Sequence, residues 1–74
     1  MIDEQAALKA LGAQIRTLRK IKGLTQEDLA ALCDFDPTYV SLLERGQRNP
    51  PFSTLLKITC HLGVPLRDLV AEVK

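Results

Sequence analysis

The chain has 74 residues, the size of one small domain with a limited core. Ten basic and nine acidic residues leave a net charge of +1, so charge alone indicates no nucleic-acid partner. The sequence contains no apolar run long enough to span a membrane and nothing like a secretory signal, so we expect a cytoplasmic protein.

The first expected element is a helix over about Asp3 to Lys22. Apolar residues recur along it at spacings of three and four, which is typical of an amphipathic helix: Leu8, Leu11, Ile15, Leu18 and Ile21. Gly23 is expected to end this helix in the left-handed conformation. Between residues 9 and 22 the chain carries five basic residues and no acidic ones, which predicts a basic face.

Residues 26–45 predict two short helices joined by a tight turn. Thr25 can cap the first helix, and Asp34 stands at the turn position where a left-handed backbone is usual. Asp36 and Pro37 suit the start of the second helix. The residue before a proline avoids helical backbone angles, as an N-cap residue does. Proline has no N–H, and the first helical position needs none for the hydrogen bonds of the helix.

The apolar residues of this stretch fall where two packed helices need them. They are Leu29, Ala30, Cys33, Phe35, Val40 and Leu43. Ala30 is small enough for a close approach of the two helices. The second helix, ending near Arg45 before Gly46, is then free to enter the major groove of DNA, as in a helix-turn-helix.

A fourth helix is expected after the loop at 49–51 and before Gly63. Its predicted core stripe consists of Phe52, Leu55, Leu56 and Leu62, with Ile58 and Thr59 beside it. A last helix should cover about residues 65–73. The whole chain, 1–74, is therefore predicted to be a single all-α domain of five helices.

The last helix carries many apolar groups for the end of a chain: Leu66, Leu69, Val70 and Val73. They could simply complete the core of one chain. Alternatively, some pack inward and others form a contact between two copies of the chain.

The sequence contains few residues of the kinds that form an enzyme active site or a metal site. His61 is the one histidine, and we expect it to lie against the core. Cys33 and Cys60 lack the CxxC spacing of metal sites, and Cys33 is expected to be a buried thiol. We therefore expect no catalytic residues, no metal and no cofactor.

The outward face of the second helix of the pair is the candidate DNA-reading surface. Its members are Pro37, Thr38, Tyr39, Ser41 and Leu42. Leu42 can touch a thymine methyl group, and Thr38 and Ser41 can hydrogen-bond to base edges or phosphates. Tyr39 suits contact with the DNA backbone or with thymine. Because none of these makes a bidentate base contact, we expect DNA shape to contribute to specificity.

Phosphate contacts are expected from three places. The first is the start of the first helix of the pair, where N–H groups are free and Gln26 lies. The second is the segment after the reading helix, with Arg45, Gln47, Arg48 and Asn49. The third is the basic face of the first helix, through Lys9, Arg16 or Lys20. Any one of these side chains alone could be an ordinary solvated group; their placement around one helix end favours phosphate binding.

Six motifs in order resemble the phage-repressor-type (XRE-like) helix-turn-helix family. They are IRTLR at 15–19, KGLTQEDLA at 22–30, LERG at 43–46, RNP at 48–50, LLKI at 55–58 and LGV at 62–64. Within that family, DPTYVS at 36–41 is similar to the recognition helix of the controller proteins of restriction–modification systems.

The resemblance implies a lambda-repressor-like domain in which Gln26 binds a backbone phosphate and Arg19 forms a structural ion pair with Glu44. It also implies that four residues meet DNA: Thr38, Tyr39, Ser41 and Arg48. Two departures stand out. Pro37 replaces a side chain that is often basic in controllers, so one base contact is expected to be missing, and Asp34 replaces the usual turn glycine.

The same resemblance implies a homodimer in which the last helices meet about a two-fold axis. The two reading helices would then lie about 34 Å apart, one DNA turn, and read a palindromic operator. We hypothesise an autoregulatory transcription regulator with no small-molecule effector, and the resemblance to controllers extends the hypothesis to control of restriction–modification genes. The alternatives are a small phage-type repressor, an antitoxin-type protein-binding module and a helical scaffold.

Overall fold

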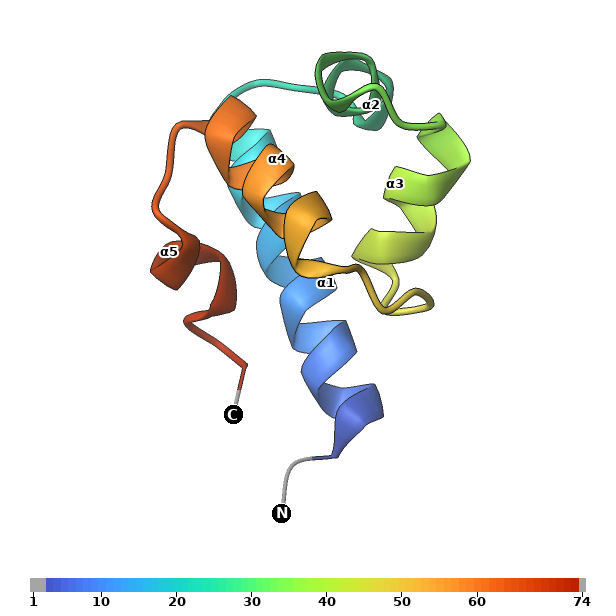
Figure 1. The fold of residues 1–74 in the computed structure, drawn as a ribbon, viewed down its shortest axis with the longest axis vertical. Helices are drawn as coiled ribbons and strands as arrows, with labels where there is room; N and C mark the ends of the chain where they lie inside the picture. The colour runs from blue at the N-terminus through green and yellow to red at the C-terminus, as the bar shows by residue number, and fades with distance from the viewer. Residues whose placement is uncertain (1–2, 74) are drawn as a thin grey trace.

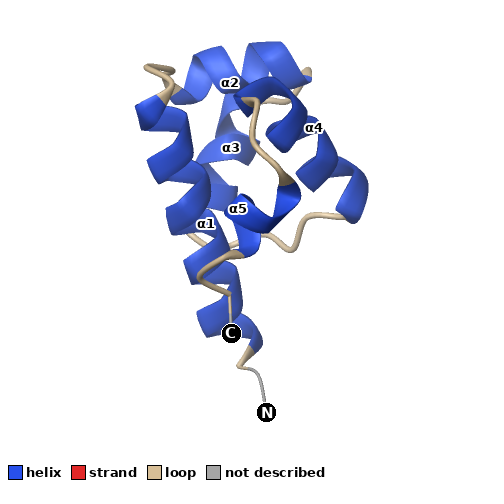
Figure 2. Ribbon diagram, turned by 90° about the vertical axis from the view of Figure 1, so that its left-hand side faces the viewer, coloured by secondary structure: helices blue, strands red, loops and turns tan. Residues whose placement is uncertain are grey.

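The computed structural model describes residues 3–73 and shows five α-helices (Figure 1). They are α1 (Glu4–Ile21), α2 (Gln26–Cys33), α3 (Pro37–Glu44), α4 (Phe52–Leu62) and α5 (Leu66–Val70). Helices and loops account for the whole described range, so the predicted all-α, five-helix fold is confirmed (Figure 2). None of the helices formed by residues 3–73 is long and apolar enough to cross a membrane.

Side chains cap the first three helices, and the caps at Thr25 and Asp36 are the predicted ones. At the start of α1, Asp3 accepts a hydrogen bond from a backbone N–H of the first turn. Thr25 and Asp28 form a reciprocal capping box at the start of α2, and Asp36 caps α3 ahead of its first-turn proline. Asp34 holds the turn between α2 and α3 with φ 59° and ψ 44°, the left-handed conformation expected there.

The core lies where all five helices meet. Its buried apolar side chains are Leu11, Ile15, Leu29, Ala30, Cys33, Val40, Leu43, Ile58, Leu62 and Leu69. Phe35 packs against the core while half-buried. The apolar set predicted for the helix pair is therefore confirmed.

Glycine allows α1 and α3 to pack against each other with their backbones in near contact. A Cβ on Gly12 of α1 would lie 2.3 Å from the backbone oxygen of Leu43 and 2.6 Å from that of Glu44. Just after α3, a Cβ on Gly46 would lie 2.8 Å from the Cα of Lys9, and its φ of +74° is itself left-handed. These two glycines fix how α3 sits on α1.

The predicted core stripe of α4 is wrong at two positions. Phe52 and Leu56 are 61% and 46% exposed, whereas Thr54, Ile58 and Leu62 are buried. The buried residues follow one another at intervals of four along one face of α4. Phe52 and Leu56 are offset from them by two positions, which places them on the opposite side of the helix.

Two other predicted core contacts are absent. Ile21, at the last position of α1, is 75% exposed. His61 is also exposed and does not lie against the core. Both residues stand at or next to the end of a helix, where fewer neighbouring elements remain to cover a side chain.

The last helix is shorter than the predicted range of about 65–73. It covers Leu66–Val70 and begins at Pro65 without a side-chain cap. Leu69 is completely buried within the chain, so its assignment to a contact between two copies is wrong. Val70 is 37% exposed and remains available for such a contact.

Candidate nucleic-acid interface

The first turns of α3 carry the predicted reading residues. Pro37 and Thr38 are exposed, and Ser41 and Leu42 are half-buried. Tyr39, expected at an exposed position, is also half-buried. Its ring meets the ring of Phe35 edge-on, with centroids 5.3 Å apart and planes at 84°. This contact with Phe35 at the edge of the core restricts the orientation of the Tyr39 phenol.

An open hollow of about 670 Å³ lies where the end of α1, the start of α2 and the first turns of α3 come together. Its lining combines the predicted phosphate ligand Gln26 with Thr38 and Ser41 of the reading face. Lys20 adds a positive charge to the rim and Glu27 a negative one. The structure thus brings together residues that the sequence assigns separately to phosphate and base contact.

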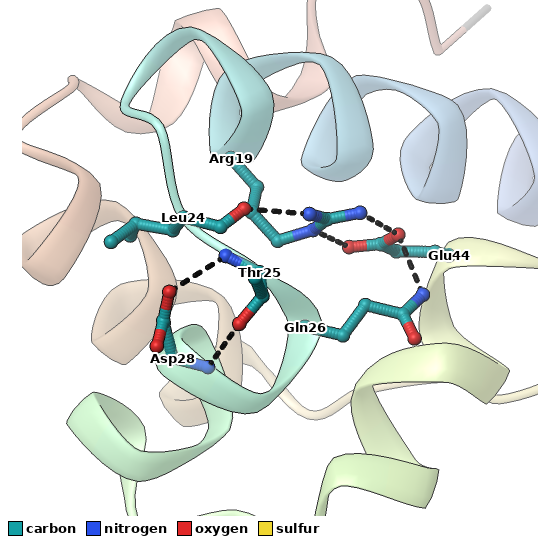
Figure 3. A network of polar contacts seen from close by, with 6 residues as sticks. All are labelled: Arg19, Leu24, Thr25, Gln26, Asp28 and Glu44. Carbon is teal, nitrogen blue, oxygen red and sulfur yellow. Dashed lines mark hydrogen bonds and ion pairs between the residues drawn. The ribbon is translucent and has the colours of Figure 1, made fainter.

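A buried polar network lies behind this hollow (Figure 3). Arg19 Nε donates to Glu44 Oε2 at 2.7 Å, and a terminal nitrogen of Arg19 donates to Glu44 Oε1 at 3.0 Å. The other terminal nitrogen donates to the carbonyl of Leu24 at 2.7 Å. The side chains of Arg19 and Glu44 are only 8% and 3% exposed. Glu44, through its hydrogen bond, raises the pKa of the Arg19 guanidinium.

This network contains the ion pair that the family resemblance implies, together with a bond that the sequence did not suggest. Gln26 Nε2 donates to Glu44 Oε1 at 3.0 Å, so one carboxylate connects α1, α2 and α3 (Figure 3). The sequence signal for this bond was the Arg19–Glu44 ion pair. A carboxylate that accepts two hydrogen bonds from an arginine can still accept a third.

The basic and amide side chains that follow α3 are all exposed. Arg45 is the C-cap residue of α3, at the opposite end of the helix from Thr38. Arg48 donates to the backbone oxygen of Gln47 at 3.0 Å, and Asn49 Nδ2 lies 3.3 Å from Glu4 Oε1 of α1. These groups therefore form a second cluster, separate from the hollow.

The basic side chains of α1 that were predicted to help, Lys9, Arg16 and Lys20, are exposed as well. Of the three, Lys20 lines the hollow and Lys9 packs against Gly46. Between Leu24 and Glu44 the chain carries five acidic residues and no basic ones. Any attraction for phosphate would therefore have to come from backbone N–H groups and from these outer cations.

Two further titratable groups have shifted pKa values. Hydrogen bonds from the backbone and side chain of Thr25 lower the pKa of Asp28, which fits its place in the capping box. Burial raises the pKa of the Cys33 thiol, so this cysteine is held in its neutral form. Among residues 3–73, no three histidine, cysteine or acidic side chains gather into a possible metal site.

A family model described as helix-turn-helix matches residues 15–69. The chain belongs to this helix-turn-helix family. The match spans α2, α3 and α4, the C-terminal part of α1 and most of α5, so it covers both the hollow and the buried network. It confirms the membership that the six sequence motifs indicate.

Members of this family with similar sequences include regulators and control proteins. The chain is 45% identical over 62 residues to the HTH-type transcriptional regulator y4dJ of Sinorhizobium fredii, covering 84% of this chain and 80% of that protein. It is 41% identical over 64 residues to the control protein C.MunI of Mycoplasma, covering 85% of this chain and 86% of that protein.

Solved structures of helix-turn-helix proteins have the same fold. The restriction–modification controller protein C.AhdI of Aeromonas hydrophila superposes with a TM-score of 0.84 at 44% identity, covering 86% of this chain and 97% of that one. The controller protein C.Esp1396I, solved as a tetramer with its natural 35-base-pair operator, superposes with a TM-score of 0.78 at 35% identity. That match covers 90% of this chain and 93% of the other.

Proposed function

We propose that this helix-turn-helix protein is a transcription regulator that binds a palindromic operator as a homodimer. The observation that carries the proposal is the hollow between α2 and α3. It places Gln26 and the start of α2 beside Thr38 and Ser41 of the exposed α3 face. A phosphate donor and base-reading groups are needed side by side where a helix enters the major groove next to the DNA backbone.

The contacts differ in what they contribute. Thr38, Ser41 and Leu42 are the residues we assign to base edges, with Pro37 and Tyr39 beside them. We assign the backbone phosphates to the start of α2 with Gln26, and to a second group after α3: Arg45, Arg48 and Asn49. Phosphate contacts dominate affinity, whereas the few base contacts set the preferred sequence.

We further propose that operators of this protein control restriction–modification genes, including its own gene. The support is its similarity to proteins named as control or controller proteins, over most of their length. Since an operator is DNA inside the cell, we place the protein in the cytoplasm. A reporter driven by the protein's own promoter should change its output when the protein is deleted, and unchanged output would exclude autoregulation.

The dimer part of the proposal is supported by apolar groups that one chain leaves uncovered. Val70 of α5 is exposed, and Leu66 and Val73 are half-buried at the same end of the chain. Phe52 and Leu56 of α4 are also exposed. Apolar residues gather in the cores of homodimer interfaces, and burying them would offset part of the cost of association.

The decisive experiment begins with selection of bound sites from random DNA, which reports the half-site and its spacing together. The dissociation constant for the selected duplex should then rise steeply with salt, as counterion release requires. We expect Thr38→Ala to relax the preference at one base position. Arg48→Ala should weaken binding to all sequences and reduce the salt slope by about one.

The matched control for these variants is His61→Ala. This side chain is exposed near the end of α4 and belongs to neither cluster, so its removal should leave the affinity unchanged. Failure to enrich any site would exclude the proposed function and favour a protein-binding module. Sedimentation of Val70→Glu tests the dimer separately, because a buried carboxylate at the contact should shift the protein toward monomer.

A further inference from the structure

We propose that Glu44 is a positioning residue that orients the side-chain amide of Gln26 toward a DNA backbone phosphate. The inference rests on the proposed function, because it concerns how the DNA site is held ready. It assigns to the buried ion pair a role beyond joining α1 to α3. The contact that carries it is the 3.0 Å bond from Gln26 Nε2 to Glu44 Oε1.

The carboxylate of Glu44 is itself immobile. Arg19 donates to both of its oxygens, at 2.7 and 3.0 Å, and Arg19 is tied in turn to the carbonyl of Leu24. Both side chains are also buried, so close packing restricts their rotamers. Gln26 therefore hydrogen-bonds to a fixed point of the scaffold.

That bond decides which way round the amide lies. If Gln26 were flipped, its oxygen would face the Glu44 carboxylate, and two acceptors would repel each other. The amide nitrogen must therefore face Glu44, and the amide oxygen points away from it (Figure 3). Among residues 3–73 the Gln26 side chain makes this one hydrogen bond, so its second N–H remains able to donate.

The remaining N–H is useful to an anion. Gln26 lines the open hollow at the start of α2, where the helix dipole favours negative charge. A phosphate oxygen only accepts hydrogen bonds, so a fixed N–H is the group it requires. An amide already held in place loses less conformational entropy on binding than a freely rotating one. The contribution of Gln26 to DNA affinity should thus depend on Glu44.

The test removes the positioning carboxylate and retains a packed interior. The double variant Arg19→Met with Glu44→Leu replaces the ion pair by apolar side chains of similar size, an exchange that buried pairs often tolerate. Gln26→Met is then introduced into the wild-type protein and into the double variant. Affinity for the selected operator is measured in all four proteins, with circular dichroism to verify folding.

We expect Gln26→Met to weaken operator binding about tenfold in the wild type and less than about twofold in the double variant. The control is Arg48→Ala, whose side chain donates to the backbone oxygen of Gln47 and not to the network, and which should cost the same in both backgrounds. An equal loss from Gln26→Met in both backgrounds would overturn the positioning role and leave the proposed function intact. Absence of an operator for the wild-type protein would instead reject the proposed function.

A measurement on the wild-type protein does not depend on the double variant folding. In its nitrogen-15 spectrum, the two side-chain amide protons of Gln26 should be widely separated, unlike those of Gln5, which is exposed on α1. Adding operator should shift the proton that faces the hollow. Replacing single phosphates by uncharged methylphosphonates should abolish that shift at one position. Amide protons that resemble those of Gln5 in the free protein would overturn the inference.

Discussion

The helix-turn-helix formed by α2 and α3 differs in construction from the C-terminal pair formed by α4 and α5. Both α2 and α3 begin with a side chain that accepts a backbone hydrogen bond. A buried ion pair ties the end of α3 to α1, and Gln26 at the start of α2 donates a hydrogen bond to the same carboxylate. By contrast, α4 and α5 begin at Pro51 and Pro65 with no side-chain cap. They also carry three exposed large apolar side chains, Phe52, Leu56 and Val70, whereas α2 and α3 together carry one, Leu32.

The difference shows which half is complete within one chain. In the α2–α3 half, helix ends and buried charges have partners, so the geometry of the reading face is set before DNA arrives. The α4–α5 half exposes apolar surface to water, which costs free energy. We propose that a second copy of the chain covers this surface. The predictions below test this contrast, beginning with the largest expected effect.

Removing the carboxylate that joins three helices should have the largest effect. Glu44→Ala leaves the guanidinium of Arg19 buried without its partner, and we expect a loss of about 3–5 kcal/mol in the free energy of unfolding. Urea denaturation followed by circular dichroism measures it. Glu72→Ala, at an exposed position, is the control and should change stability by less than about 0.5 kcal/mol.

Leu69 and its neighbour Val70 separate the two roles of α5. Leu69→Ala should cost about 3 kcal/mol because it opens a cavity in the core, whereas Val70→Ala should cost little within one chain. Thermal unfolding at low concentration, where a dimer dissociates, gives both values. Similar losses for the two variants would contradict the division of α5 into a buried and an exposed side.

The close packing of α1 on α3 should resist a single added methyl group. Gly12→Ala gains helix propensity, yet its Cβ would overlap the backbone oxygen of Leu43, and we expect a net loss of about 2 kcal/mol. Denaturant unfolding measures the loss. Ala13→Ser provides a control one position along, on the exposed side of α1, and should be nearly neutral.

Helix capping tests the contrast directly. Thr25→Ala removes the cap of α2 and should cost about 1 kcal/mol, since an N–H of the first turn loses its acceptor. Pro51→Ser offers α4 the cap that it lacks and should be neutral or stabilising by up to about 0.5 kcal/mol. Equal losses in unfolding experiments on both variants would show that the two halves do not differ in this respect.

The smallest expected effect is a dependence of stability on pH. Thr25 lowers the pKa of Asp28 in the folded protein, so the ionised carboxylate stabilises the fold at pH values above the pKa of the unfolded chain. This stabilisation is lost as the pH falls through the lowered folded-state pKa. Thermal unfolding between pH 7 and pH 3 should therefore show a shallower decrease for Asp28→Asn than for the wild type.

Local sequence chemistry was enough to predict the turn and the ends of the first four helices, but not the end of α5. Thr25, Asp36 and Asp34 act through hydrogen bonds or backbone preferences that span two or three residues, so they are readable in the chain itself. The inward set of α2 and α3 followed from spacing in the same way. The DNA-contact and dimer residues remain predictions, apart from Leu69, because their partners are not part of this chain.

Where the predictions from the sequence were wrong, they lacked the direction from which another helix approaches. The amphipathic pattern of α4 allowed two stripes, and only packing against α2 and α5 selected the one through Ile58 over the one through Phe52. Likewise, no sequence pattern indicated that α3 needs the space that Gly12 leaves on α1.

The sequence by itself thus determined the elements, their caps and the family, since each depends on short-range hydrogen bonding, backbone preference or a motif in fixed order. Only the tertiary structure decided which apolar side chains are covered and that Gln26 meets Glu44, a residue 18 positions away. Such contacts depend on the relative placement of whole helices. That placement results from the packing of many side chains at once, so no single segment of the sequence specifies it.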